Sequence, residues 1–177
     1  MMEVGRITGG SVAWSRAHFG AWCTVSAPLI LGLDVTDHAT LATIVPFITN
    51  PEAIAVNQQW AGHPGRKVAE LGEAYNTYLD AEGNVTGASF PVQVWVKPQP
   101  KGKLAVYVVN PGPNATDVAL NFTTLGLGAS VTAAGVRDLW TRKDTGDATA
   151  AVLKASVPSM DSIFLLLTPK PAPLVEA

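Results

Sequence analysis

The acidic side chains that could do chemistry are scattered along this sequence and are not paired. Asp34 follows the apolar run Leu29–Leu33, and Glu3 lies close to the first residue. A carboxylate at the end of a buried strand can contact a ligand or support the residues that do, whereas an aspartate just before a helix commonly caps it. Both roles stay open for Asp34, with the capping role favoured, and a structural role is favoured for Glu3.

The other reactive residue types are isolated. His18 lies among aromatic residues in a helical pattern, which favours a packed, hydrogen-bonded histidine over a base or a metal ligand. Cys23 is the single cysteine, so it can form neither an intrachain disulfide nor a cysteine-based metal site. Arg137 and Asp138 are neighbours in a predicted strand and point to opposite faces, which favours a salt bridge or turn contact over a catalytic pair. Because the sequence has no metal-ligand spacing, phosphate loop or dinucleotide motif, we expect no metal and no organic cofactor.

Two tryptophans offer a different chemistry. Aromatic faces can stack against sugar rings, so Trp95 and Trp140 could form a carbohydrate-binding platform. Both lie in segments with the alternating pattern of strands, where large aromatic residues also fill the core. The core role is favoured.

Composition limits both the fold and the partners. The chain has 177 residues, of which 47% are hydrophobic and 15% are charged, and its net charge is −2. This length is short of the roughly 250 residues of a complete eight-stranded barrel. A charged fraction below the usual figure of about 25% indicates surface that other structure covers. Without a basic cluster, nucleic acid and acidic membranes are not expected partners. The apolar stretch Phe19–Leu33 is too short for a membrane span and contains Pro28, so it predicts a helix followed by a buried strand.

The first part of the chain predicts helices on either side of one parallel strand. A helix is expected over Ser11–Val25, because Ser11 can cap it and apolar residues follow at helical spacing. The run Leu29–Leu33 is typical of a parallel strand that is buried on both faces. Two more helical segments follow, one ending at Ile48 and one over Glu52–Gln58. This order of elements is that of the last part of a (β/α)8 TIM barrel.

The second part predicts an antiparallel β-sandwich, because short apolar or alternating runs are separated by turn residues. The runs are Val92–Val96, Leu104–Val109, Asp117–Phe122, Val136–Trp140, Ala150–Val157 and Ile163–Thr168. The expected domains are the end of the barrel (1–68), an acidic linker or long loop (69–91), the sandwich (92–168) and a flexible, proline-rich tail (169–177).

Five collinear motifs resemble the α-galactosidase (melibiase) family of glycoside hydrolases. They are Met2-Glu3-Val4-Gly5; Arg16-Ala17-His18-Phe19 with Trp22; Ala27-Pro28-Leu29-Ile30-Leu31-Gly32; Ile54-Ala55-Val56-Asn57-Gln58 with Gly65-Arg66-Lys67-Val68; and Val136-Arg137-Asp138-Leu139-Trp140. The sequence departs from the family pattern at Gln59-Trp60, where the family has Asp-Pro, and in the longer segment 69–90. These departures indicate a distant branch.

The resemblance implies a retaining glycosidase in which one aspartate is the nucleophile and another the acid/base. Both would precede Met1, so the isolated chain is expected to be inactive, and Met1 would line the sugar pocket. The implied substrate of the whole enzyme is a terminal α-D-galactoside or an α-N-acetylgalactosaminide, and a homodimer, as in the family, stays open. Two alternatives also stay open: a non-catalytic carbohydrate-binding or interaction module built on the sandwich, and a gene fragment without an independent role.

Three Asn-x-Thr sequons, at Asn84, Asn114 and Asn121, are acceptor sites for glycosylation in a secreted protein. The sequence shows no charged leader followed by an apolar segment and a cleavage site. Together with the resemblance, the sequons predict a secreted, lysosomal or vacuolar parent protein whose signal is not in this chain.

Overall fold

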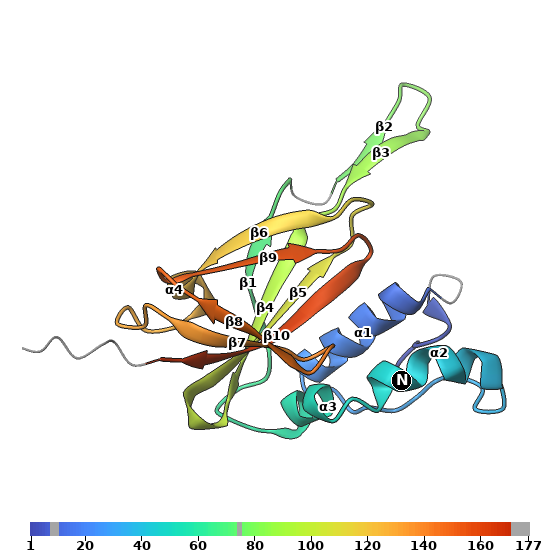
Figure 1. The fold of residues 1–177 in the computed structure, drawn as a ribbon. Coiled ribbons are helices and arrows are strands. Elements are labelled where there is room, and N and C mark those ends of the chain that lie inside the picture. The colour runs from blue at the N-terminus through green and yellow to red at the C-terminus, as the bar shows by residue number, and fades with distance from the viewer. Residues whose placement is uncertain (8–10, 74–75, 171–177) are drawn as a thin grey trace, which may run out of the picture.

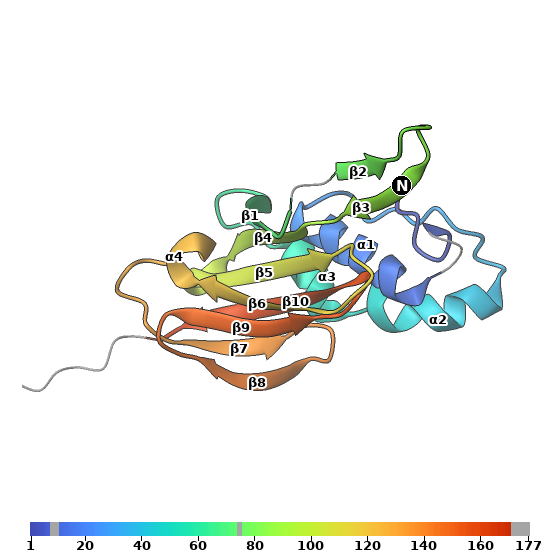
Figure 2. The same cartoon turned by 90° about the horizontal axis from the view of Figure 1, so that it is seen from above.

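The protein is built in three layers, with helices on one face of a six-stranded sheet and a two-stranded sheet on the other (Figures 1 and 2). A computed structural model describes residues 1–7, 11–73 and 76–170. The helical layer consists of α1 (Val12–Thr24), α2 (His38–Ile48) and α3 (Pro51–Gln58).

All strand pairs of the three sheets are antiparallel. The six-stranded sheet has the order β1 (Arg66–Leu71), β4 (Val92–Gln99), β5 (Lys103–Asn110), β10 (Asp161–Pro169), β7 (Ala134–Asp138), β8 (Lys143–Ala148). The second layer of the sandwich is the pair β6 (Thr116–Asn121) and β9 (Val152–Val157), with the short helix α4 (Phe122–Leu125) beside it. A hairpin of β2 (Asn76–Leu79) and β3 (Val85–Ser89) projects from the body (Figure 1).

Strand β5 shows why the protein has two cores. Its buried residues alternate between the faces of the sheet, as in any strand. Leu104, Val106 and Val108 belong to the core between the two sheets. Ala105 and Tyr107 belong to the core between the sheet and the helices. Because both faces are covered, the strand has a continuous apolar sequence. The prediction of an antiparallel β-sandwich is confirmed.

Side chains cap the N-termini of all three helices of this layer, and α1 begins where the sequence predicts. The Ser11 hydroxyl accepts a hydrogen bond from the Trp14 amide at 3.3 Å and caps α1. The Asp37 carboxylate accepts from the Thr40 amide at 3.1 Å and caps α2. Asn50 caps α3 by accepting from two backbone amides of its first turn.

Polar contacts at both ends of α3 join the helical layer to the sheet. At its N-terminus, the Arg137 guanidinium binds both carboxylate oxygens of Glu52, at 2.8 and 2.7 Å. At its C-terminus, the buried Lys97 ammonium donates to the carbonyl oxygens of Val56 and Asn57. A cation at this end of a helix opposes the partial negative charge of the free carbonyls. The helices and the sandwich are therefore held together by charge as well as by the apolar core.

The prediction that Leu29–Leu33 is a parallel strand buried on both faces is wrong about its burial. Within the described chain this segment pairs in parallel with the N-terminal segment at one bridge, Met2 with Leu31. Ile30 and Leu31 are 57% and 37% exposed, so the segment is not buried on both faces. The physical reason is that a parallel strand is buried only when neighbours flank it and helices cover it, and Met2 supplies a neighbour on one side only.

The segment 69–91, expected to be a linker, contains the end of β1 and the β2–β3 hairpin. In the tail, β10 extends to Pro169, and the Lys170 amide donates to the Ala133 carbonyl oxygen at 2.9 Å. Residues 171–177 lie outside the described residues. The domain boundaries themselves stay predictions.

Candidate functional site

The predicted site residues Met1 and Asp34 lie at the two ends of a short parallel pair. The Met2 amide donates to the Ile30 carbonyl oxygen at 2.7 Å, and the Gly32 amide donates to the Met2 carbonyl oxygen at 3.0 Å. A Cβ atom at Gly32 would lie 2.8 Å from the Met2 carbonyl oxygen, so glycine allows the two segments to approach. Met1 is 72% exposed and lies next to Gly32.

Asp34 is engaged within its own turn. Its Oδ1 atom accepts from the Thr36 amide at 2.8 Å and from the Thr36 hydroxyl at 2.7 Å. These hydrogen bonds hold the pKa of Asp34 below its usual value. The helix cap considered for Asp34 is instead Asp37, whose pKa is lowered in the same way by Thr40. Asp34 therefore stabilises the turn before α2 as an ionised carboxylate.

Asp34 and Asp37 line an open notch of about 470 Å³ together with Arg6. The Arg6 guanidinium donates to the Gly32 carbonyl oxygen at 2.6 Å. Each carboxylate accepts hydrogen bonds from a threonine, which favours the charged form over the protonated form that a general acid needs. The notch can bind polar groups, but neither carboxyl group in it is suited to donate a proton.

The isolated residues adopt the structural roles that were favoured for them. The His18 Nε2 atom accepts a hydrogen bond from the Glu3 amide at 3.1 Å, and burial lowers the pKa of the imidazole. Cys23 is fully buried, which raises its thiol pKa to about 12. Asp138 accepts from the backbone amides of Trp140 and Thr141, a turn contact. In the parts of the chain that the structure describes, no three His, Cys, Asp or Glu residues come together as a metal site.

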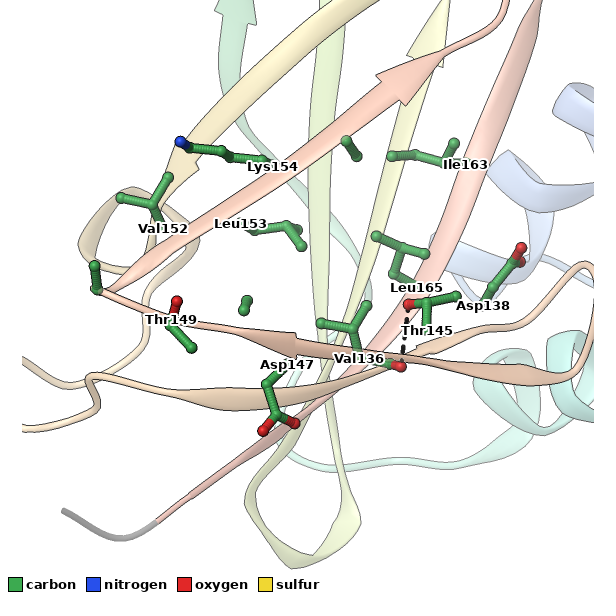
Figure 3. A pocket seen from close by; sticks show the side chains of 13 residues that line it. Val136, Asp138, Thr145, Asp147, Thr149, Val152, Leu153, Lys154, Ile163 and Leu165 are labelled. Carbon is green, nitrogen blue, oxygen red and sulfur yellow. Dashed lines mark hydrogen bonds between the residues drawn. The ribbon is translucent and has the colours of Figure 1, made fainter. Parts of the chain in front are cut away.

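A cleft lies at the open side of the sandwich, between β8 and β9 (Figure 3). It has a volume of about 560 Å³ and an apolar floor that includes Val136, Leu153 and Leu165. Figure 3 shows its two carboxylates, those of Asp138 and Asp147, on separate sides of Val136. Asp138 is used in its turn, and Asp147 pairs with the Lys170 ammonium at 2.6 Å. This cleft has no arrangement that indicates acid/base chemistry.

The structure does not bring Trp95 and Trp140 together as one platform. Trp140 packs on Phe164, with ring centroids 5.4 Å apart, and its indole nitrogen is buried. Trp95 is half-buried and lines a groove of about 300 Å³ between α1 and the strands β4 and β5. Trp14 and Trp22 line the same groove, and the sequence analysis did not identify them as site residues. Their spacing of eight residues, two helical turns, was the available signal.

The three sequon asparagines are all exposed. Asn84 lies in the turn of the β2–β3 hairpin, where its side-chain amide donates to Asp80. Asn114 lies in the connection between β5 and β6, and Asn121 ends β6. Each is accessible to a modifying enzyme. Among the described helices, none is long and apolar enough by itself to cross a membrane; α2 and α3 meet these criteria only as a pair bent by 64°.

Comparisons with known proteins agree on one family. Residues 89–167 match the model of the α-galactosidase C-terminal β-sandwich domain. The chain is 30% identical to α-galactosidase 3 of Arabidopsis thaliana over 172 residues, which are 96% of this chain and 35% of that protein. It is 31% identical to α-galactosidase of Coffea arabica, with 96% and 39% of the two chains covered. The chain thus spans between a third and two fifths of the length of these relatives.

Solved structures give the same result. The α-galactosidase I of Mortierella vinacea superposes with a TM-score of 0.71 and 25% identity, over 94% of this chain and 38% of that one. An α-galactosidase of Saccharomyces cerevisiae shares the fold with a TM-score of 0.75 and 20% identity, over 96% of this chain and 46% of that one. From the matched domain and these relatives, we identify the chain as a C-terminal portion of the α-galactosidase (melibiase) family of glycoside hydrolases.

Proposed function

We propose that the chain is the C-terminal part of a retaining glycoside hydrolase that acts on terminal α-D-galactosides. The observation that carries the proposal is the 30% identity to a plant α-galactosidase over 96% of the chain, helices and sandwich together. The relatives described above are α-galactosidases, and one structure of the Saccharomyces cerevisiae enzyme contains raffinose. An α-N-acetylgalactosaminide is the alternative substrate.

In this proposal residues 1–68 are the closing part of a (β/α)8 barrel. The parallel bridge between Met2 and Leu31, with α1 as the connection, supports it, because parallel strands need such a crossover. Exposure supports it too: among the described residues, eight of the twelve clearly exposed large apolar side chains lie in residues 1–68. Met1, Ile30 and Val35 are 72%, 57% and 63% exposed, and the rest of a barrel would cover such side chains.

The proposed chemistry is double displacement by two aspartates that lie outside residues 1–177. One attacks the anomeric carbon, and the other protonates the leaving oxygen and then activates water; retaining enzymes hold the two carboxyl groups about 5–5.5 Å apart. This reaction needs no metal or organic cofactor. Residues of this chain would contribute Met1 beside the sugar and the parallel Met2–Leu31 bridge that holds it in place. We further propose a secreted, lysosomal or vacuolar enzyme that is glycosylated at its exposed sequons and can form a homodimer.

The gene upstream of codon 1 and the activity of its product test this proposal. We expect an in-frame sequence that encodes Trp-Asn-Asp-Pro-Asp directly before Met1 and, on an earlier strand, the nucleophile. The full-length product should hydrolyse p-nitrophenyl α-D-galactopyranoside, and NMR should show the α-anomer of galactose as the first product. Purified residues 1–177 should show no turnover. An unrelated upstream sequence, or turnover by residues 1–177 that survives repurification, would overturn the proposal.

A further inference from the structure

We propose that the groove between α1 and the sheet is a binding site for a pyranose ring. We call it the tryptophan groove. The lining residues on which the argument depends are Trp14, His18 and Trp22 of α1 and Gln93, Trp95 and Val109 of the sheet. Its volume of about 300 Å³ lies at the lower end of the range of small-molecule sites, about 300–1,000 Å³. The proposal goes beyond the proposed catalytic function, because it concerns sugar binding by residues of this chain.

Two elements supply aromatic side chains to the groove. Trp14, His18 and Trp22 are spaced four residues apart, so they lie along one face of α1. Across the groove, Gln93 and Trp95 are two residues apart and share one face of β4. All five side chains are half-buried, so part of each remains open to a ligand. The groove therefore offers the flat apolar surfaces on which the C–H face of a sugar ring can stack.

Two polar side chains of the groove, His18 and Gln93, are oriented by contacts of their own. The Nε2 atom of His18 accepts from the Glu3 amide, so the neutral imidazole carries its proton on Nδ1. Burial lowers the pKa of His18, which favours this neutral form. The Gln93 Oε1 atom accepts from the Trp95 indole N–H at 3.2 Å, which leaves the amide N–H groups as donors. Both side chains can therefore offer a donor to a ligand.

This pattern of groups decides the class of ligand. None of the described residues that line the groove is an acid, a lysine or an arginine, so a phosphate or another ion would lack a counter-charge. A purely apolar ligand would leave the donors of His18 and Gln93 without partners, which costs free energy. A pyranose satisfies both requirements, because it combines an apolar ring face with oxygen acceptors at its edge.

The test uses residues 1–177 labelled with ¹⁵N and titrated with methyl α-D-galactopyranoside up to about 100 mM, since single sugars commonly bind with a Kd in the millimolar range, about −4 kcal/mol. The readout is the indole N–H signals of the five tryptophans. We expect saturable shifts for the three groove tryptophans and none for Trp60, which is 63% exposed on a loop. A parallel titration with methyl α-D-glucopyranoside shows whether the axial C4 hydroxyl of galactose contributes to binding. Binding of either sugar supports a pyranose site.

Two variants make the result specific. Gln93→Leu keeps the volume of the side chain but removes its donor, and we expect the Kd to rise at least tenfold. Trp60→Phe is the matched control and should leave the Kd unchanged. Thermal melting of both variants checks that they fold. Absence of saturable shifts with either sugar, equal shifts of Trp60 and the groove tryptophans, or unchanged binding by a folded Gln93→Leu variant would overturn the proposal.

Discussion

Replacing Gly20 with alanine is expected to destabilise the protein, although alanine is the better helix former. Gly20 lies inside α1, where the exchange would gain about 1 kcal/mol from helix propensity alone. A Cβ atom there would lie 2.6 Å from Tyr107 Cε2 and 2.9 Å from Trp140 Cζ2. Neither ring is free to move. The Tyr107 hydroxyl donates to the Ala17 carbonyl oxygen at 2.6 Å, and both rings pack on Phe164.

Overpacking of this kind costs about 1–3 kcal/mol, and two anchored rings favour the upper end of that range. Subtracting the gain in propensity leaves a net loss of about 2 kcal/mol, which corresponds to a fall in Tm of about 4–8 °C for a chain of this size. Urea and thermal unfolding measure the effect. Ala21→Gly is the control. Ala21 faces the tryptophan groove, so this exchange should lower the free energy of unfolding only by the difference in helix propensity, about 1 kcal/mol. A Gly20→Ala variant that melts above the wild type would refute the close packing of α1 on Tyr107.

Three further predictions concern buried groups. The Cys23 thiol, with its pKa raised to about 12, should resist maleimide at mildly alkaline pH in the native protein and react in urea; rapid native labelling would contradict its burial. Asp161→Asn should lower the free energy of unfolding in urea by about 2 kcal/mol, because it leaves the half-buried Arg16 guanidinium without its partner. The control Asp117→Asn changes an exposed residue and should have little effect. Equal effects of the two variants would show that the ion pair does not stabilise the fold. His18 has a folded pKa below its unfolded value of 6.5, so the unfolded chain binds the proton first and stability should fall as the pH drops below about 6.5. His18→Gln should show a smaller loss over the same pH range, and an identical pH profile would exclude this linkage.

The sequence predicts those strands whose buried faces leave an apolar pattern. In β5 the run Leu104–Val109 identifies the strand, because both of its faces are covered. Strand β8 leaves no such pattern: it lies at the edge of the sheet, and only Ala148 of its six residues is buried. Its place beside β7 is set by backbone hydrogen bonds and by the short turn that joins the two strands. Sequence periodicity reports burial, so an exposed edge strand is missed.

The tryptophan groove was missed for a related reason. Helical spacing predicts that Trp14 and Trp22 share a face, but not whether that face meets a covering element or an opening. The answer depends on β4, about 70 residues further along the chain, which places Gln93 and Trp95 opposite α1. The short pattern around Asp34 likewise did not predict which of two nearby aspartates caps α2. Such choices are made by tertiary contacts and by single hydrogen bonds.

The position of β10 has a consequence for how the protein folds during its synthesis on the ribosome. The last described strand lies inside the six-stranded sheet, between β5 and β7 (Figure 1). Its Asp161 pairs with Arg16 of α1. Both cores need it, since Leu165 belongs to one and Phe164 to the other. Domains fold as units when the chain emerges at about 5–20 residues per second. Until β10 is made, β5 and β7 each lack one of their two neighbours in the sheet, and these open edges are vulnerable to aggregation.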